Sequence, residues 1–274
     1  QHPVGALLTP ETGRAELDPS QGSILAVLTN VTAMAAFPHV VSGAWLVAGA
    51  FLTGVASWHM VRHHRAAREM GLETEEGQEQ HRAARDLYRP TVRFGVVAMF
   101  VSAIVLVISG DFQAQIMFKQ QPMKMASAEA LCETETGASF SILTIGGPDA
   151  FAEQCGDVTH LIEVPYVTSF LATHTFDATL QGVDDLNAQY KEEFGETATN
   201  IHGEEVEVDY RPNLFVTYWS FRLMMGLAAF SGILALWALW VTRGKGENAR
   251  TTGSKAFQWF AVLAIPMPFL ANSA

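Results

Sequence analysis

The chain has 274 residues, of which 49% are hydrophobic and only 16% are charged, and its net charge is −11. A typical soluble domain has roughly a quarter of its residues charged, which argues against a single soluble core. The negative charge gives no reason to expect a nucleic-acid partner. Because the apolar residues gather in blocks between polar loops, the sequence predicts a multi-pass protein of a lipid bilayer.

Four apolar blocks follow one another along the chain, at residues 39–61, 94–110, 214–241 and 256–274. A transmembrane helix needs about 20 apolar residues. The first and third blocks are long enough, the second is near the lower limit, and the fourth is incomplete. We therefore expect an all-α integral membrane protein, a transmembrane helix bundle with three full spans and part of a fourth.

The loops between the blocks differ in charge. Residues 62–93 hold seven arginines, and residues 242–255 hold four further Lys or Arg. The positive-inside rule makes both loops cytoplasmic and places residues 1–38 and 111–213 outside the cytoplasm. Since residues 111–213 carry 18 acidic side chains, we expect an extracytoplasmic loop domain there.

The 62–93 loop repeats itself loosely as HRAAREM and HRAARDL. Such a repeat could form an anion or lipid-headgroup site. It could equally be a solvated helical hairpin whose acidic and basic side chains pair at i,i+4 spacing. We favour the hairpin.

The chain has two cysteines, Cys132 and Cys155, and both lie in the expected outer loop. Two cysteines in one extracytoplasmic loop favour a disulfide. In the chain-entropy model such a bond stabilises a protein by roughly 3 kcal/mol. Spacing alone leaves two free thiols open as the alternative.

Two polar side chains stand at or within the expected spans. His39 is at the outer end of the first span, where a histidine is either an interfacial residue or a haem ligand. Arg222 lies within the third span, where a charge costs at least about 2.5 kcal/mol. The apolar runs of the neighbouring spans hold no Asp or Glu. The anionic partner of Arg222 must therefore be another segment, a lipid or a cofactor, and a haem propionate would serve.

Met224 and Met225 follow this arginine. A methionine in a helix is usually packing material, but a thioether near a boundary histidine could complete a His/Met haem site. The two methionines point about 100° apart on a helix, so the residues alone do not choose between them.

The stretch QQPMKMASAEALCETE, residues 120–135, directly follows the second span. Oxidation of a quinol needs a carboxylate that accepts a hydroxyl proton, and Glu129 could be that base. Lys124 could orient the ring oxygen. On spacing alone, a solvated helix that begins at Pro122 is the better explanation of these charges.

Several motifs together resemble the central part of subunit I of the cytochrome bd quinol oxidase family. They occur in the family's order and cover nearly the whole chain: FPHVVSGA, SGDFQAQ, QPMKMASAEALCETE, IGGPD, VPYVTSFLAT, VTYWSFRLMMG and IPMPF. The combination of QPMKMA with TYWSFRLMMG is the most specific part of the resemblance.

The resemblance implies a role for each matching position. His39 and Met224 match the axial ligands of a low-spin b-type haem, so Met224 is preferred to Met225. Arg222 matches an arginine near the propionates of that haem. Lys124 and Glu129 match the pair implicated in quinol oxidation in the family's outer loop, the Q loop.

Two further positions follow from the same motifs. Asp111 matches an acidic position at the entrance of the Q loop, with its role left open. Cys132 would tie the quinol-binding segment to Cys155.

The resemblance also implies what the chain lacks. It opens on Gln1 and stops within apolar sequence, so we expect a fragment that is not active by itself. Four earlier spans, the oxygen-reducing site and the ligands of further b-type and d-type haems would lie elsewhere in subunit I. The expected partners are ubiquinol or menaquinol, oxidase subunit II and the remaining parts of subunit I, in a bacterial cytoplasmic membrane. The whole enzyme would be electrogenic without pumping protons.

Two other functions compete with this interpretation. The chain could be a non-redox membrane scaffold or transporter module in which Arg222 binds an anionic partner. It could also be another b-type cytochrome with a bis-histidine haem. His39 and His59, however, would lie about 30 Å apart on one helix, too far for one haem.

Overall fold

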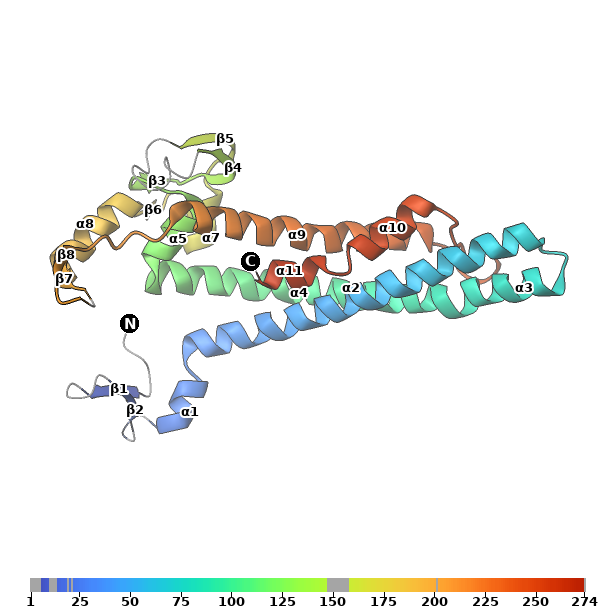
Figure 1. Cartoon of the computed structure of the whole chain (residues 1–274), viewed down its shortest axis with the longest axis horizontal. Helices are drawn as coiled ribbons and strands as arrows, with labels where there is room; N and C mark the ends of the chain where they lie inside the picture. The colour runs from blue at the N-terminus through green and yellow to red at the C-terminus, as the bar shows by residue number, and fades with distance from the viewer. Residues whose placement is uncertain are drawn as a thin grey trace. The chain divides into compact units, whose positions relative to one another are not determined.

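The structure is a computed structural model that describes residues 6–9, 14–18, 20, 22–146, 158–200 and 202–273. Its helices and strands are labelled along the chain in Figure 1. The chain forms two compact units, one of Gln1–Ala35 with Gly110–Arg222 and one of Ala36–Ser109 with Leu223–Ala274. We call them the loop unit and the helical unit and describe each by itself.

Long helices dominate the chain. Within the described residues, four helical stretches are long and apolar enough to cross a membrane, which confirms the predicted class of helical membrane protein. They comprise α2 (Val31–Met70), α4 (Arg89–Gln120, continuous with the short helices before it), α9 (Leu214–Val241) and the pair α10 (Lys255–Leu263) and α11 (Met267–Ser273). Each of the four blocks expected from the sequence falls on one of these stretches.

Several helices extend beyond the expected blocks, and prolines lie at two of the places where structure and expectation differ. Helix α2 begins at Val31, ahead of the expected start, and carries Pro38 inside it. The last stretch is broken between Leu263 and Met267, because Pro266 and Pro268 supply no backbone N–H for a continuous ladder.

The loop between α2 and α4 is a helical hairpin, the alternative that the sequence favoured. It contains α3 (Glu75–Arg82) and a π-helical segment, η2 (Ala83–Tyr88). The Thr74 hydroxyl caps α3 by accepting a hydrogen bond from the Gly77 N–H at 3.0 Å. Arg65 and Glu69 form one i,i+4 ion pair at 4.0 Å.

Arginines near this hairpin bind carbonyl groups at the C-terminal end of α9 and in the loop that follows it. Arg89 donates to the Thr242 carbonyl at 2.8 Å, and Arg93 donates to the same oxygen at 3.0 Å. Arg85 reaches the Gly246 carbonyl. The C-terminal carbonyls of a helix have no intrahelical partner and carry partial negative charge, so these cations satisfy them.

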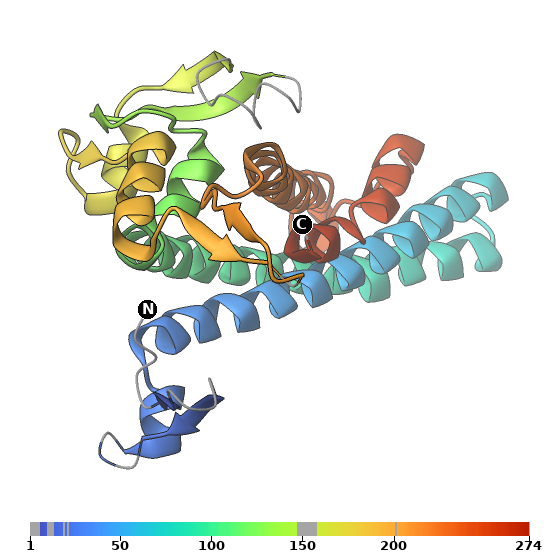
Figure 2. The same ribbon diagram turned by 60° about the vertical axis from the view of Figure 1, so that its left-hand side comes forward.

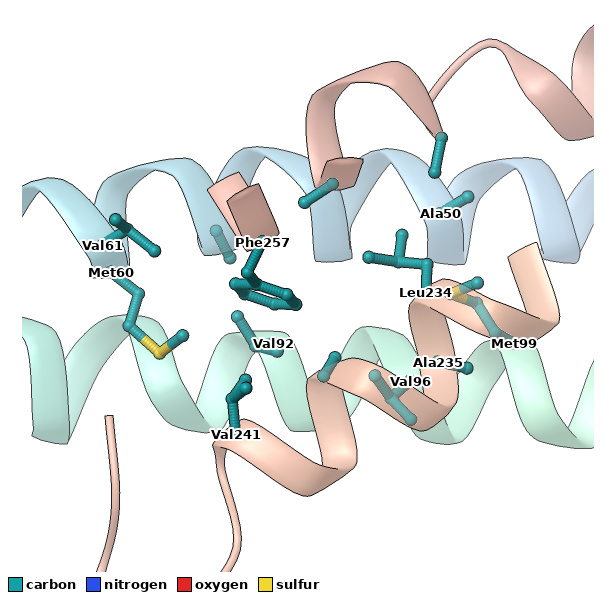
Figure 3. Packing of buried hydrophobic residues seen from close by; sticks show 14 of the residues in the cluster. Ala50, Met60, Val61, Val92, Val96, Met99, Leu234, Ala235, Val241 and Phe257 are labelled. Carbon is teal, nitrogen blue, oxygen red and sulfur yellow. The ribbon is translucent and has the colours of Figure 1, made fainter. Parts of the chain in front are cut away.

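The helical unit has one apolar core, shown in Figure 3. Its buried side chains come from α2, α4, α9 and α10 and include Met60, Val96, Met99, Leu234 and Phe257. Helices α2 and α4 approach closely through small residues. A Cβ atom added at Gly49 would lie 2.7 Å from Met99 Cγ and 3.1 Å from the Gly95 carbonyl oxygen. Small residues of this kind let membrane helices pack backbone to backbone.

The loop unit contains short helices and four two-stranded antiparallel sheets among its described residues. The elements are β1 (Ala6–Thr9), β2 (Arg14–Leu17), α1 (Ser23–Leu28), α5 (Pro122–Glu129), β3 (Glu135–Thr136), β4 (Phe140–Ile145), β5 (Thr159–Val164), α7 (Val167–Thr173), β6 (Thr179–Leu180), α8 (Val183–Phe194), β7 (Thr197–Thr199) and β8 (Glu205–Glu207). Figure 2 shows β4 beside β5. A core that includes Met123, Leu131, Leu186 and Tyr218 joins α5, α7, β6, α8 and the start of α9.

The close approach at Gly49 yields a test in the full-length protein. Gly49→Ala should destabilise the fold by about 1–3 kcal/mol, because the Met99 side chain and the α4 backbone leave no room for a methyl group. Gly43→Ala on the same helix is the control, since its added Cβ meets nothing within 4 Å. The thermal unfolding midpoint in detergent should fall for Gly49→Ala alone. Equal midpoints for both variants would contradict this packing.

Candidate functional site

Helix α5 ends in a turn that fixes the direction of Glu129. Pro122 occupies the first turn of the helix, where its missing N–H costs nothing. Ala130 then takes a left-handed conformation with φ 52°. The Leu131 N–H donates to the Ala126 carbonyl at 2.9 Å, a bond typical of a Schellman end. This turn buries Glu129, which is only 6% exposed.

Glu129 forms a buried ion pair with Arg222. Arg222 Nη2 lies 2.7 Å from Glu129 Oε2, and the two side chains are 7% and 5% exposed. Arg222 Nε also donates to the Ser141 carbonyl at 2.7 Å. Of the three kinds of partner that the sequence left open for Arg222, the described residues supply another segment of the chain.

Aromatic rings complete the surroundings of the guanidinium. Its carbon lies 4.5 Å from the ring centroid of Phe140 and 4.6 Å from that of Tyr218. A cation over an aromatic face is attracted by the ring quadrupole, and more strongly where water is excluded. The site is therefore a dry enclosure around one positive and one negative group.

This enclosure changes the acidity of Glu129. Burial of the carboxylate raises the pKa of Glu129 from 4.5 to about 7, while the Arg222 guanidinium acts in the opposite direction. Near neutral pH the side chain can therefore both accept and release a proton. The folded state holds this proton more tightly than the unfolded state, so protonation of Glu129 adds to the free energy of unfolding. This contribution is fully present below about pH 4.5 and is lost as the pH rises through about 7.

Lys124 does not share this enclosure. Its side chain is exposed on α5, whereas Met123 and Met125 on either side of it are buried. The structure therefore places the two members of the expected quinol pair in different surroundings, with Glu129 inside and Lys124 at the surface.

A second cluster of polar side chains surrounds Ser141 on β4, and the sequence analysis did not identify it. His160 Nδ1 on β5 lies 2.7 Å from Thr144 Oγ1 and 3.0 Å from Ser141 Oγ. The Tyr218 hydroxyl donates to the Ser141 carbonyl at 3.3 Å. Tyr218 precedes Arg222 by four residues on one face of α9, and that spacing was the available signal for its part in the site.

Asp111, whose role the sequence left open, pairs with His174. The His174 Nε2 atom lies 3.0 Å from Asp111 Oδ2 and 2.8 Å from Gln115 Nε2. His174 is the residue that ends α7, in a left-handed conformation. The contact therefore fastens the end of α7 to α4 within the loop unit.

His39 has a fixed orientation in the helical unit. Its Nδ1 atom lies 3.0 Å from the Ser109 hydroxyl, which itself donates to the Val105 carbonyl at 2.6 Å. Since the hydroxyl proton is used, Ser109 is positioned to accept from Nδ1–H, and a neutral imidazole in this orientation has Nε2 unprotonated. A metal-binding histidine commonly has this second contact.

The structure does not choose between the two candidate methionines. Met224 and Met225 are both half-buried on α9. In the described part of the chain, no group of three or more His, Cys, Asp or Glu side chains could hold a metal ion. A haem iron bound by one histidine and one methionine needs no such group.

The cysteine expectation falls partly outside the described residues. Cys132 is disulfide-bonded. Cys155, its expected partner, lies in the stretch 147–157 that the structure does not describe.

The chain matches one family model over residues 1–274, described as cytochrome bd terminal oxidase subunit I. It is 28% identical over its whole length to the cytochrome bd ubiquinol oxidase subunit 1 of Bacillus subtilis (strain 168). It is 23% identical to the cytochrome bd-II ubiquinol oxidase subunit 1 of Escherichia coli (strain K12), again over the whole chain.

The chain spans only part of these proteins. It covers 49% of the Bacillus relative and 56% of the Escherichia relative. Among solved structures, the bd oxidase from Geobacillus thermodenitrificans aligns with a TM-score of 0.66 at 19% identity. That alignment covers 99% of this chain and 50% of the solved chain, and it shows a shared fold.

The opposing effects on Glu129 lead to a prediction about its titration in the full-length protein. Arg222→Gln should raise the pKa of Glu129 above about 7, because the charge that favours the carboxylate is removed. Infrared titration of the carboxylic-acid band, assigned by its loss in Glu129→Gln, measures the shift. Arg211→Gln is the control, since Arg211 pairs with Asp209 at 2.8 Å. An identical titration in wild type and Arg222→Gln would show that the pair does not form.

Proposed function

Because the chain belongs to the cytochrome bd terminal oxidase subunit I family, we propose that it forms the electron-entry part of a quinol:oxygen oxidoreductase of the aerobic respiratory chain. In this proposal a quinol, ubiquinol or menaquinol, is oxidised in the loop unit on the extracytoplasmic side. The observation that carries the proposal is the buried pair of Glu129 with Arg222, which puts a proton acceptor in a dry aromatic enclosure.

Glu129 accepts a proton from the quinol hydroxyl in this mechanism. A general base works best when its pKa is close to the working pH, and the pKa of about 7 for Glu129 meets that condition. Arg222 stays charged and holds the carboxylate in place through the 2.7 Å contact. Lys124 is exposed, so its role is to meet the quinol as it enters and to orient a ring oxygen.

In this proposal His39 and Met224 would hold a low-spin haem b, and the bound haem would supply a one-electron acceptor. The contact of His39 Nδ1 with Ser109 suits this role because it leaves Nε2 for the iron. The role of Arg222 near the propionates of such a haem, which the family resemblance implies, remains part of the proposal.

The rest of the enzyme lies beyond this chain in the proposal. Further b-type and d-type haems, ligated elsewhere in subunit I, would reduce oxygen to water, and oxidase subunit II would complete the complex. Protons would leave on the outer side and be consumed from the inner side of a bacterial cytoplasmic membrane. The reaction would be electrogenic without pumping. Cys132 with Cys155 would stabilise the outer loop.

The competing scaffold or transporter function needed an anionic partner for Arg222 from outside the chain. The structure supplies that partner within the loop unit as Glu129. The observation that motivated the alternative is thereby explained without an anionic substrate.

Replacing Glu129 tests the proton-acceptor role in the full-length oxidase with its subunit II. Glu129→Gln should lower the turnover number with quinol by about 100-fold or more, because an amide cannot accept the proton. The control is Glu133→Gln, an exposed carboxylate four residues away. Unchanged turnover in Glu129→Gln would refute the role.

Replacing each methionine tests the ligand assignment. Met224→Leu in the full-length subunit should abolish the low-spin haem band in the reduced-minus-oxidised spectrum, since leucine has no thioether to bind iron. Met225→Leu, one residue away and equally half-buried, should leave the band intact. An intact band in Met224→Leu, or its loss in Met225→Leu alone, would overturn the choice of Met224.

A further inference from the structure

The hairpin of β4 and β5 has an irregular register that brings two hydroxyl groups to one side. In a regular strand, residues three apart point to opposite faces. The β4–β5 pairing shifts between Ser141 and Leu143 and again between Leu143 and Thr144. As a result Ser141 and Thr144 are both buried, at 1% and 0% exposure. Bulges of this kind redirect side chains at functional sites.

These hydroxyls form a connected hydrogen-bond chain with His160. The Ser141 and Thr144 hydroxyls form a hydrogen bond with each other, and both hydroxyl oxygens lie within 3.0 Å of His160 Nδ1. Tyr218 Oη lies 3.4 Å from Ser141 Oγ at the inner end of the chain. At the outer end, His160 Nδ1 lies 3.7 Å from Glu163 Oε1.

Exposure to solvent increases along this chain. Tyr218 is fully buried. The side chain of His160 is 30% exposed and that of Glu163 is 41% exposed. A continuous polar path therefore leads from the interior of the loop unit to its surface.

The inner end of the path adjoins the ion pair. One edge of the Arg222 guanidinium contacts Glu129 through Nη2, and Nε donates to the Ser141 carbonyl at 2.7 Å. Glu129 and Ser141 are thus held by the same guanidinium. Arginine does not give up its proton in proteins, so Arg222 positions both groups without relaying protons.

We propose that Tyr218, Ser141, Thr144 and His160 form a proton-release path for quinol oxidation, with His160 as the outer acceptor. The inference rests on the proposed function. Oxidation of a quinol to a quinone breaks two O–H bonds and releases two electrons, which a haem held by His39 and Met224 would take up in two one-electron transfers. Glu129 takes one proton. The other passes to the inner hydroxyls, whose own proton moves to His160 Nδ1 and from there to Glu163 or water.

The side chains suit this role chemically. A hydroxyl can accept one hydrogen bond while donating another, as a relay requires. Histidine is the side chain that most readily changes charge near neutral pH. The charged or titratable groups in contact with this hydrogen-bond chain are Glu163 on the same strand as His160, Tyr218, and Arg222 at the Ser141 carbonyl.

The first test uses the full-length oxidase complex with quinol as substrate. His160→Gln keeps a polar side chain but removes the proton acceptor, so turnover should fall about tenfold or more. Imidazole added to the medium should restore it, which a merely structural defect would not allow. His202→Gln, an exposed histidine elsewhere in the loop unit, should retain wild-type turnover.

Failures of the two proposals can be told apart. A wild-type complex that oxidises no quinol overturns the proposed function and this path with it. An active wild type with unaffected His160→Gln turnover, or a loss that imidazole does not restore, overturns the path alone. The low-spin haem band should be the same in the wild type and in His160→Gln.

The second test needs no turnover. Exchange of the imidazole C2 hydrogen, followed by mass spectrometry, reports the protonation of His160 in the purified protein. Thr144→Val removes a hydroxyl 2.7 Å from Nδ1, so the midpoint pH of this exchange should shift. The exchange of His202 is the internal reference. An unshifted midpoint for His160 would show that the imidazole is not coupled to the hydroxyl chain.

Discussion

The ion pair between Glu129 and Arg222 is the interaction on which the rest of the site depends. Breaking a buried pair by removing one partner costs about 3–5 kcal/mol, because it leaves a lone charge in a medium of low polarity. Arg222 has further contacts here, since it also donates to the Ser141 carbonyl and lies against the ring of Phe140. The pair therefore joins α5, β4 and α9 at one point.

The same enclosure explains why the carboxylate can serve as a base. Desolvation favours the neutral form of Glu129, and the neighbouring cation favours the charged form. Their balance leaves the pKa near neutrality, as a group that takes and releases protons requires. A solvated Glu129 would be a weaker base, and a buried Glu129 without Arg222 would hold its proton too tightly. The buried contact with Arg222 therefore sets both the position of the Glu129 carboxylate and its pKa.

Much of the fold could be predicted from the sequence, because apolar blocks of sufficient length leave few alternatives in a membrane. The helical hairpin between α2 and α4 also followed from charge spacing. The sequence shows where the prolines are, but it does not predict which of them interrupt a helix. Pro38 lies inside α2, whereas Pro266 and Pro268 interrupt the last stretch. Whether a proline breaks a helix depends on tertiary packing that no local pattern records.

The candidate site was predicted in part. The unusual cost of Arg222 in an apolar run pointed to a partner, and Glu129 was named as a base, but the two were not paired with each other. Their contact joins residues 93 positions apart, which periodicity and spacing do not reveal. Ser141, Thr144 and His160 were missed because their convergence depends on a strand irregularity. Lys124 was paired with Glu129 through the family resemblance, and the structure buries Glu129 while leaving Lys124 exposed.

In the proposed function, quinol is oxidised in the enclosure of Glu129 and Arg222. A high-resolution structure of the full-length oxidase with a bound quinol analogue tests this location. We expect a ring oxygen within hydrogen-bond distance of the Glu129 carboxylate, with the contact to Arg222 retained. An analogue bound elsewhere, with Glu129 and Arg222 still paired and enclosed by Phe140 and Tyr218, would contradict it.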